Sequence, residues 1–592
     1  MDVLAENIAA VSAGAVVTLG VVMALWSMFQ PGIPTIEVPL EMYEQDCNMT
    51  GPSHPEMKLK DPKRPGFVQC YDPSTLQHLG EMEAMTPARV HEVVAKARAA
   101  QAGWAKTSWR ERRRVLNTIQ KYILAHQEDI CRVAARDSGK PKLDALLGEV
   151  LTTCEKIRCV NAHGEQWLRP DKRPSGPLMM HKNAYVEYQP LGVLGVIAPW
   201  NYPFHNMLNH VVSGVFAGNG VVSKVSEYTC WSSRYFTEIV RQAFIACGHN
   251  PDLVQTVTGF GEAGAALVAS GVDKIIFTGS PEVGRKVMEG AAPHLKPVIL
   301  ELGGKDPLVV CEDADLGAVL PFALRGVYQN CGQNCCGVER VYVYEGLYDE
   351  FVDKAARLAG ALRQGPPLGG DPVDCGAMVM PAQLDIVQRL VDDAIAKGAR
   401  CLVGGSRNQD LPQGNFYRPT VLADVTHEML IAQEEVFGPV MCILKVPNNS
   451  DEAALALVND CKYGLGSSVF SRSQPRAERL VRRIRAGMGC ANDFASNYLI
   501  QALPFGGVKD SGFDRFAGPE GLRACCLQRA TVVDKLSFFR TTIPKPLQYP
   551  IAPAGLDFGK GMIGIMYSFK LSEKIASVFK LLKASMAKTA TE

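Results

Sequence analysis

Short apolar runs alternate with helical stretches between Tyr185 and about Cys311, and this alternation limits the possible folds more than any other feature of the chain. The runs are GVLGVIAPW, GNGVVSKV, DLVQTVTG, KIIFTGS and KPVILELGG. Each ends at glycine, proline or a small polar residue, as buried parallel strands do. Strands that alternate with helices predict an α/β fold with a parallel, Rossmann-type sheet.

Two further segments extend this pattern. Helical spacing of apolar residues predicts amphipathic helices between Pro87 and Leu147. A second α/β segment runs from Asp315 to about Gly506, with RVYVYEG, PTVLADV and VMCILKV as its strands. At 592 residues and 47% hydrophobic composition, the chain can bury the cores of two or three domains.

Charge and cysteine content exclude several classes of partner. The 62 basic and 61 acidic side chains leave a net charge of +1, so no global field attracts nucleic acid, and we expect no nucleic-acid partner. The 18 cysteines show neither a disulfide rhythm nor the CxxC pairs of structural zinc sites. We therefore expect no metal, and mostly buried thiols in a reducing compartment.

The N-terminus predicts a membrane anchor. Ile8 to Phe29 form 22 residues without a charge, and a helix of that length spans roughly 33 Å, enough for a hydrocarbon core of about 30 Å. A cleaved signal peptide and an apolar segment docked on the protein are the alternatives. Asp2 and Glu6 stand where a signal peptide carries basic residues, which favours the retained anchor. We expect a single-pass protein of the endoplasmic reticulum or another endomembrane, with a cytosolic body.

The C-terminal tail, from Gly559 to Lys588, intersperses lysines, among them Lys570, Lys574, Lys580, Lys583 and Lys588, with Ile, Phe, Leu and Met. This pattern suits a basic amphipathic helix on an anionic membrane surface. A terminal helix packed on its own protein is the equal alternative.

Two motifs predict covalent chemistry. Gly332-Gln333-Asn334-Cys335-Cys336 places a cysteine in a turn of small residues, and Glu301-Leu302-Gly303-Gly304-Lys305 places a carboxylate at the end of an apolar strand. A cysteine pair in a loop is most often structural. A thiol nucleophile beside a carboxylate base at a sheet switch point would nevertheless form a covalent catalyst.

From about Gly66 to Asp534 the chain resembles the aldehyde dehydrogenase superfamily. The resemblance rests on the ordered motifs PWNYPFHN, FTGSPEVG, ELGGK, GQNCCGVER, EEVFGPV and PFGGVKDSGFDR. The hydrophobic leader and extended C-terminus are most similar to the membrane-anchored plant and algal members. The resemblance implies an NAD-binding domain, a catalytic domain, and an oligomerisation arm near Pro170–Tyr188 and Gln528–Leu536 that predicts a homodimer or homotetramer.

The implied boundaries are 1–30 for the anchor, 31–66 for a linker, 67–303 for the NAD-binding domain with its arm at about 170–188, 304–506 for the catalytic domain, 507–540 for a return to the NAD-binding domain and an oligomerisation strand, and 541–592 for the tail.

The superfamily also implies a role for each matching residue. Cys335 matches the nucleophile, Glu301 the general base, and Asn201 the side-chain donor to the oxyanion. The implied reaction is the NAD-dependent oxidation of an aldehyde to a carboxylate through a cysteine thioester, and the membrane anchor favours a lipid-derived or otherwise hydrophobic aldehyde. Relatives that release the acyl group to coenzyme A lack the glutamate, so Glu301 favours hydrolysis. A silent membrane scaffold is the third alternative.

Cofactor contacts are implied in the same way. Lys224 and Glu227 match the pair that holds the adenosine ribose, and a carboxylate there disfavours the 2′-phosphate of NADP. Gly279 and Ser280 match the opening of a helix that faces the pyrophosphate. Glu435 and Phe437 match the residues that place the nicotinamide ribose and ring.

Three residues depart from the family pattern. Val225 stands where the family has proline after the cofactor lysine. Glu339 replaces a small residue after the nucleophile, and its purpose does not follow from the sequence. Cys336, beside the nucleophile, is either a spectator thiol or a guard by reversible oxidation.

Overall fold

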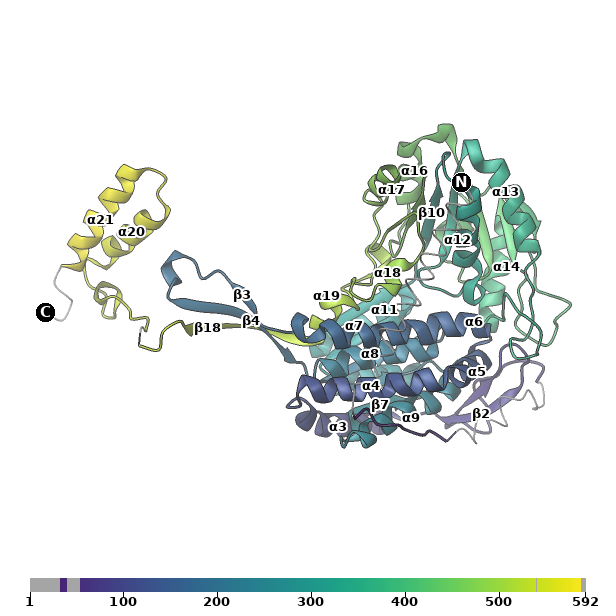
Figure 1. Ribbon diagram of the computed structural model, residues 1–592, viewed down its shortest axis with the longest axis horizontal. Helices are drawn as coiled ribbons and strands as arrows, with labels where there is room; N and C mark the ends of the chain where they lie inside the picture. Colours follow the sequence, from purple (N-terminus) through teal and green to yellow (C-terminus); the bar gives the residue numbers. More distant parts are fainter. Residues whose placement is uncertain (1–31, 40–53, 539, 587–592) are drawn as a thin grey trace. The chain divides into compact units, whose positions relative to one another are not determined.

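The computed structural model describes residues 32–39, 54–538 and 540–586 (Figure 1). Within these ranges no helix has both the length and the apolar character needed to cross a bilayer. The predicted anchor at Ile8–Phe29 lies outside the described residues. The chain divides into two compact units, one formed by residues 1–168 and 190–527 and the other by residues 169–189 and 528–592.

The first unit contains the predicted Rossmann-type sheet, with six strands in the order β17-β9-β8-β5-β6-β7. The central five strands are mutually parallel, and β17 is antiparallel to β9. The strand order reverses between β5 and β8, which is where ligands bind in open α/β sheets. The strands are β5 (Val193–Ile197), β6 (Gly220–Lys224), β7 (Val254–Val257), β8 (Lys274–Gly279), β9 (Val298–Leu302) and β17 (Gly512–Phe513).

Helices cover both faces of this sheet. One face packs on α3 (Pro87–Trp104), α10 (Gly261–Ala269) and α11 (Pro281–Ala291), which share a buried cluster with strand residues such as Val222 and Ile275. On the other face, α8 (Pro203–Phe216) approaches closely at Gly214, where a Cβ would meet side chains of Val221 and Leu194. Further helices of this part are α4 (Trp109–Ala125), α5 (Gln127–Ser138), α7 (Thr152–Trp167), α9 (Cys230–Ala246) and α19 (Gly518–Arg523).

A second sheet of seven strands, in the order β12-β13-β14-β11-β10-β15-β16, matches the predicted second α/β segment. All its pairs are parallel except β12 with β13. Helices α12 (Leu316–Tyr328) and α13 (Glu345–Gly360) pack on one face, and α14 (Pro381–Ala396), α16 (Asp451–Asn459) and α17 (Gln474–Val481) pack on the other. The strands are β10 (Asp306–Val310), β11 (Val338–Tyr344), β12 (Arg400–Val403), β13 (Thr420–Ala423), β14 (Val440–Val446), β15 (Ser468–Phe470) and β16 (Cys490–Ala491).

The second unit contains a three-stranded sheet and two helices. The sheet has the order β18-β4-β3, from β3 (Asp171–Arg173), β4 (Lys182–Pro190) and β18 (Cys526–Asp534). An ion pair between Lys182 and Asp534 joins β4 to β18. The tail forms two helices, α20 (Gly555–Tyr567) and α21 (Leu571–Ser585), where the sequence analysis expects one.

Candidate active site

One pocket of the first unit, with a volume of about 1120 Å³, collects all the predicted site residues. These are Asn201, Lys224, Glu227, Gly279, Ser280, Glu301, Cys335, Glu435 and Phe437. Six of them end or follow strands β5, β6, β8 and β9, at the carboxyl edge of the six-stranded sheet. Cys335, Glu435 and Phe437 precede β11 and β14 of the other sheet, so the pocket draws on both sheets.

The turn that presents Cys335 is backbone-strained and tightly enclosed. Asn330, Cys331 and Gly332 follow one another with φ of 51°, 57° and 74°, a left-handed conformation that non-glycine residues adopt at a cost. A Cβ on Gly332 would run into the carbonyl oxygen of Gly438. Such strain is retained where the surrounding structure fixes it, and it is concentrated here beside the thiol.

Gln333 fixes this turn from within, and it has no exposed surface. Its Nε2 donates to the Asn330 carbonyl at 2.9 Å, and its Oε1 accepts from the Val379 amide at 2.9 Å. Its own carbonyl accepts from Asn201 Nδ2 at 3.1 Å. The turn is therefore tied to segments distant in sequence on both sides.

Asn201 is oriented with its amide nitrogen toward the nucleophile turn. Its Oδ1 accepts from Asn206 Nδ2 at 3.0 Å, which leaves the Nδ2 group to face Gln333. Its backbone carbonyl accepts from Lys140 Nζ at 2.6 Å, and Lys140 forms an ion pair with Glu149 at 2.7 Å in which neither side chain is exposed. One N–H of Asn201 Nδ2 is donated to Gln333, so the other can serve as a preorganised donor beside Cys335.

Glu301 and Cys335 lie within hydrogen-bonding reach of each other. Burial raises the pKa of Glu301 to about 7, although hydrogen bonds from Cys335 and Thr278 oppose this shift. The pKa of the Cys335 thiol is raised well above its usual value by its hydrogen bond with Cys336, by burial and by the Glu301 charge. Glu301 Oε1 has no hydrogen-bond partner among the described residues. Near neutral pH the proton therefore rests on the thiol, and the Glu301 carboxylate is in place to accept it.

The opposite end of the pocket contains groups suited to a dinucleotide. Lys224 Nζ and Glu227 Oε2 are 2.9 Å apart, so a cation and a carboxylate are presented together. Ser280 is the N-cap of α11, where its hydroxyl accepts from the Val283 amide at 3.4 Å. The positive end of this helix dipole faces the pocket rim and favours a phosphate there. Gly261 and Gly264 in the first turn of α10 also line the pocket.

The loop that carries Glu435 and Phe437 is held by Glu339. The Glu339 carboxylate accepts from the amides of Val436 and Phe437, each at 3.0 Å, and forms an ion pair with Lys305 at 2.7 Å. The Lys305 side chain is fully buried, and that of Glu339 is 6% exposed. Glu339 therefore joins β11, the strand that follows the nucleophile turn, to the loop that lines the pocket. This contact gives Glu339 the role that could not be assigned from the sequence.

Glu435 itself reaches back to the ELGGK segment. Its Oε1 accepts from the Gly304 amide at 2.9 Å, and a Cβ on Gly303 would collide with its carboxyl group. Burial and the nearby charge of Glu339 raise the pKa of Glu435 to about 8. Phe437 has a left-handed backbone, with φ of 48°, and its ring meets Trp200 edge to face at 5.4 Å.

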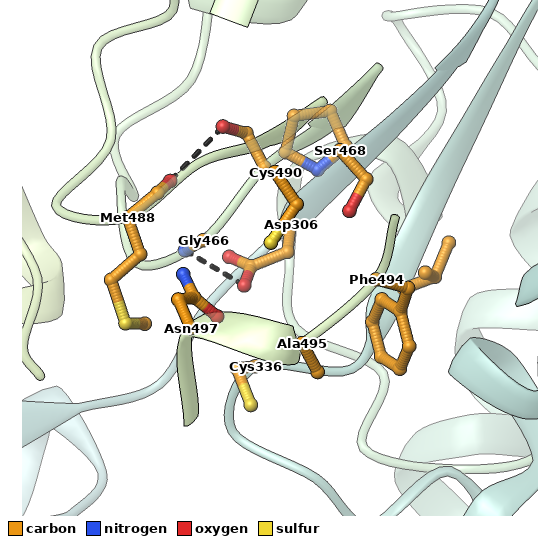
Figure 2. Close-up of a pocket in the computed structure, with 12 residues that line it drawn as sticks. Asp306, Cys336, Gly466, Ser468, Met488, Cys490, Phe494, Ala495 and Asn497 are labelled. Atoms are coloured by element: carbon orange, nitrogen blue, oxygen red, sulfur yellow. Dashed lines mark hydrogen bonds between the residues drawn. The ribbon is translucent and has the colours of Figure 1, made fainter. Parts of the chain in front are cut away.

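A second, much smaller cavity of about 10 Å³ lies behind the nucleophile turn, lined by Asp306, Cys336 and Cys490 among others (Figure 2). Asp306 Oδ2 accepts from the Gly466 amide at 2.8 Å, while Oδ1 has no partner among the described residues. Burial raises the pKa of Asp306 to about 8. This volume suits one water molecule and no substrate, so substrate chemistry belongs to the large pocket.

The sequence analysis missed the positioning residues Lys140, Glu149, Gln333 and Lys305. A signal existed for one of them, because Lys305 directly follows the paired glycines of ELGGK. Lys140 and Glu149 carry no such signal, since their pairing arises only where α5 meets the following helices. Across the described ranges, no group of three His, Cys, Asp or Glu side chains could hold a metal ion.

Comparisons with known proteins agree with this geometry. Residues 60–531 match the model of the aldehyde dehydrogenase family. An aldehyde dehydrogenase-like protein of Schizosaccharomyces pombe is 40% identical over 88% of this chain and 99% of its own length. A 4,4′-diapolycopene aldehyde oxidase of Methylomonas is 35% identical over 83% of this chain and 89% of its own. The crystal structure of a Mycobacterium tuberculosis aldehyde dehydrogenase complexed with NAD+ superposes with a TM-score of 0.75 and 30% identity, covering 81% of this chain and 97% of that one. The chain belongs to the aldehyde dehydrogenase family.

Proposed function

We propose that this enzyme uses NAD to oxidise an aldehyde to a carboxylate, with Cys335 as the nucleophile. The observation that carries the proposal is the convergence of Cys335, Glu301 and Asn201 in the lining of the same large pocket as Lys224, Glu227 and Ser280. A thiol, a base and an oxyanion donor then meet where a dinucleotide would place its reactive end.

The residues of the pocket fit NAD. Glu227 can accept hydrogen bonds from ribose hydroxyls and would repel a 2′-phosphate, and the N-terminus of α11 can receive the pyrophosphate. When bound, NAD supplies the acceptor for the hydride that leaves the substrate carbon. Glu435 and Phe437 line the same pocket near Cys335 and would orient that end of the cofactor.

The first step is activation of the thiol. Only the thiolate attacks, and the raised pKa of Cys335 means that its proton must move to a base before attack. Glu301 is the carboxylate in contact with the thiol, and with a pKa of about 7 its ionised form is available near neutral pH. The Cys335 sulfur then forms a bond to the aldehyde carbon.

The attack converts the carbonyl oxygen to an oxyanion. Asn201 Nδ2 and the Cys335 amide can donate to it from fixed positions, and one such donor is usually worth about 2.7–4 kcal/mol in the transition state. We expect Asn201→Ala to lower kcat by roughly 100- to 1000-fold with a smaller change in KM for the aldehyde. Steady-state kinetics would show this split.

Transfer of hydride to bound NAD would leave a thioester on Cys335. Glu301 must first release to solvent the proton that it took from the thiol, and its carboxylate can then take a proton from a water that attacks the thioester carbon. Cleavage of the C–S bond frees the carboxylate product and returns the Cys335 thiolate. Glu301 Oε1, which has no partner among the described residues, can receive that water. The measurement is NADH production across aldehydes from short to long chain, with Cys335→Ala as control. Turnover that persists in Cys335→Ala would reject the thioester, and stimulation by coenzyme A would reject hydrolysis as the release step.

We also propose a membrane location, in the endoplasmic reticulum or another endomembrane with the body in the cytosol, as in the membrane-anchored plant and algal group. The uncharged run Ile8–Phe29 supports it. A membrane location favours an aldehyde derived from lipid, a class that the chain-length panel tests. Protease protection of the body in intact vesicles would contradict the cytosolic orientation.

For the assembly we propose a homodimer or homotetramer built through the arm of β3, β4 and β18. Leu527 and Val532 on β18 are 53% and 62% exposed, as apolar residues of an uncovered interface are. Sedimentation of the solubilised protein would decide the number of subunits, and a monomer would contradict the proposal.

A further inference from the structure

The two C-terminal helices pack on each other through their smallest residues. A Cβ on Gly564 would collide with Ser577 Oγ, and a Cβ on Gly561 would lie 2.9 Å from the Leu581 amide nitrogen. Ala584, one turn further along α21, is 4% exposed. The interface of this α20–α21 hairpin is therefore built by close backbone approach, as helix pairs inside lipid are.

The large apolar side chains of the hairpin point away from that interface. Four of them recur three and four residues apart on α21 and form one apolar stripe. They are Leu571 (73% exposed), Ile575 (50%), Val578 (40%) and Leu582 (54%). Phe579 is 68% exposed, and Phe569, between the helices, is fully exposed. In a water-soluble hairpin such a stripe would form the helix interface, but here glycine, serine and alanine occupy it.

Charge on the same hairpin favours one kind of occupant for this apolar stripe. Residues 555–586 carry five lysines against Asp557 and Glu573, a net charge of +3. Lys570 and Lys583 are exposed, and at 3.6 residues per turn they lie on either side of the apolar stripe, whereas Lys580 pairs with Asp557 at 3.1 Å. An apolar stripe bordered by lysines matches a lipid surface with anionic headgroups, into which such a face is buried by about 5–10 Å.

We propose that the α20–α21 hairpin inserts its apolar stripe into an anionic membrane surface, as a second contact beside the N-terminal anchor. This deepens the membrane location proposed above and does not depend on the dehydrogenase activity. In this arrangement the hairpin lies at the headgroup level of the leaflet that faces the protein and does not cross the bilayer.

The test uses the full chain in vesicles of phosphatidylcholine, with or without phosphatidylserine, that contain brominated lipid as a quencher. Phe569→Trp adds emission at the tip of the hairpin, and Phe322→Trp on α12, where the side chain is 37% exposed, is the matched control on the catalytic body. We expect the emission added by F569W to be lost to the quencher, more completely with phosphatidylserine. We expect F322W to keep its emission.

High salt and charge reversal distinguish the electrostatic attraction to the lipid headgroups from the insertion of the apolar stripe. At about 1 M salt the screening length falls to about 3 Å, so the advantage of phosphatidylserine should shrink while part of the quenching stays. The double variant K570E/K583E should lose the same advantage without salt. Flotation of the vesicles shows whether the chain binds them at all, and NADH production measures the activity. A failure of membrane binding and a failure of the enzyme are therefore seen separately.

Unquenched emission from F569W in both kinds of vesicle would overturn the proposal. If F569E also sediments in detergent as a smaller assembly than the parent chain, the stripe is instead an interface with a second copy of the chain.

Discussion

Glu339→Gln tests whether a buried carboxylate outside the chemistry sets the affinity for NAD. The substitution keeps the shape of the side chain but removes its charge and turns one acceptor oxygen into a donor group. Either the Val436 or the Phe437 amide then loses its acceptor, and Lys305 is left buried without its counter-ion. Stranding one member of a buried ion pair costs about 3–5 kcal/mol, and an unsatisfied amide costs about 1–3 kcal/mol.

The chain can relieve part of this cost by letting the loop of Glu435 and Phe437 relax. To bind the cofactor, the loop must return to its original position, where one backbone amide now lacks an acceptor. That costs about 1–3 kcal/mol, which corresponds to roughly 5- to 150-fold weaker NAD binding. Titration of NAD by protein fluorescence gives the affinity, and thermal unfolding gives the stability. The matched control is Glu282→Gln, which removes an exposed carboxylate at the rim of the same pocket.

Pairing Glu339→Gln with Lys305→Met separates the ion pair from the loop contact. Glu339→Gln leaves the Lys305 charge buried without a counter-ion, and Lys305→Met leaves the Glu339 charge in the same state. The double variant removes both charges, so it should unfold at a higher temperature than Lys305→Met alone. NAD binding should stay weak in the double variant, because the loop amide is still unsatisfied. Unchanged NAD affinity in Glu339→Gln, or additive losses of stability in the double variant, would refute the reasoning.

Three further predictions follow from the site. Because the ionised form of Glu301 is the base and its pKa is about 7, kcat/KM should rise with pH through about 7, and this limb should vanish in Glu301→Gln; a limb that survives would assign the base elsewhere. Gly332→Ala should destabilise the protein by more than the roughly 1–2 kcal/mol that a left-handed backbone costs alanine, because the new Cβ meets the Gly438 carbonyl. Gly248→Ala, at a φ of 80° with open space around it, should show the backbone cost alone when both variants are unfolded by denaturant. Equal losses of unfolding free energy in the two variants would contradict the collision. Glu227→Gln should lower the ratio of kcat/KM for NAD to that for NADP, since it removes the carboxylate that repels a 2′-phosphate, and an unchanged ratio would place that discrimination elsewhere.

The sheets could be predicted from local pattern, because a buried parallel strand is a continuous apolar run closed by a breaker. All five runs between Tyr185 and Cys311 are strands of the six-stranded sheet. The grouping of Cys335 with Glu301 came from family motifs and not from spacing, since nothing in either segment specifies the other.

The role of Glu339 could not be predicted, because its partners Val436 and Phe437 meet it only after two strands and the helices between them have packed. The break between α20 and α21 was missed for a related reason. Ser568 to Lys570 contain neither glycine nor proline, so no helix breaker in the sequence marks the boundary between α20 and α21.

The ties of Gln333 bear on how the enzyme matures. Asn201, four residues after β5, and Val379, just before α14, both bond to Gln333, so the nucleophile turn takes its shape only after distant parts of the first unit have come together. A chain still emerging from the ribosome has the cysteine but not its geometry, because Val379 is synthesised after it. We therefore expect activity to appear only after the segment that follows β5 and the segment before α14 have packed around the nucleophile turn.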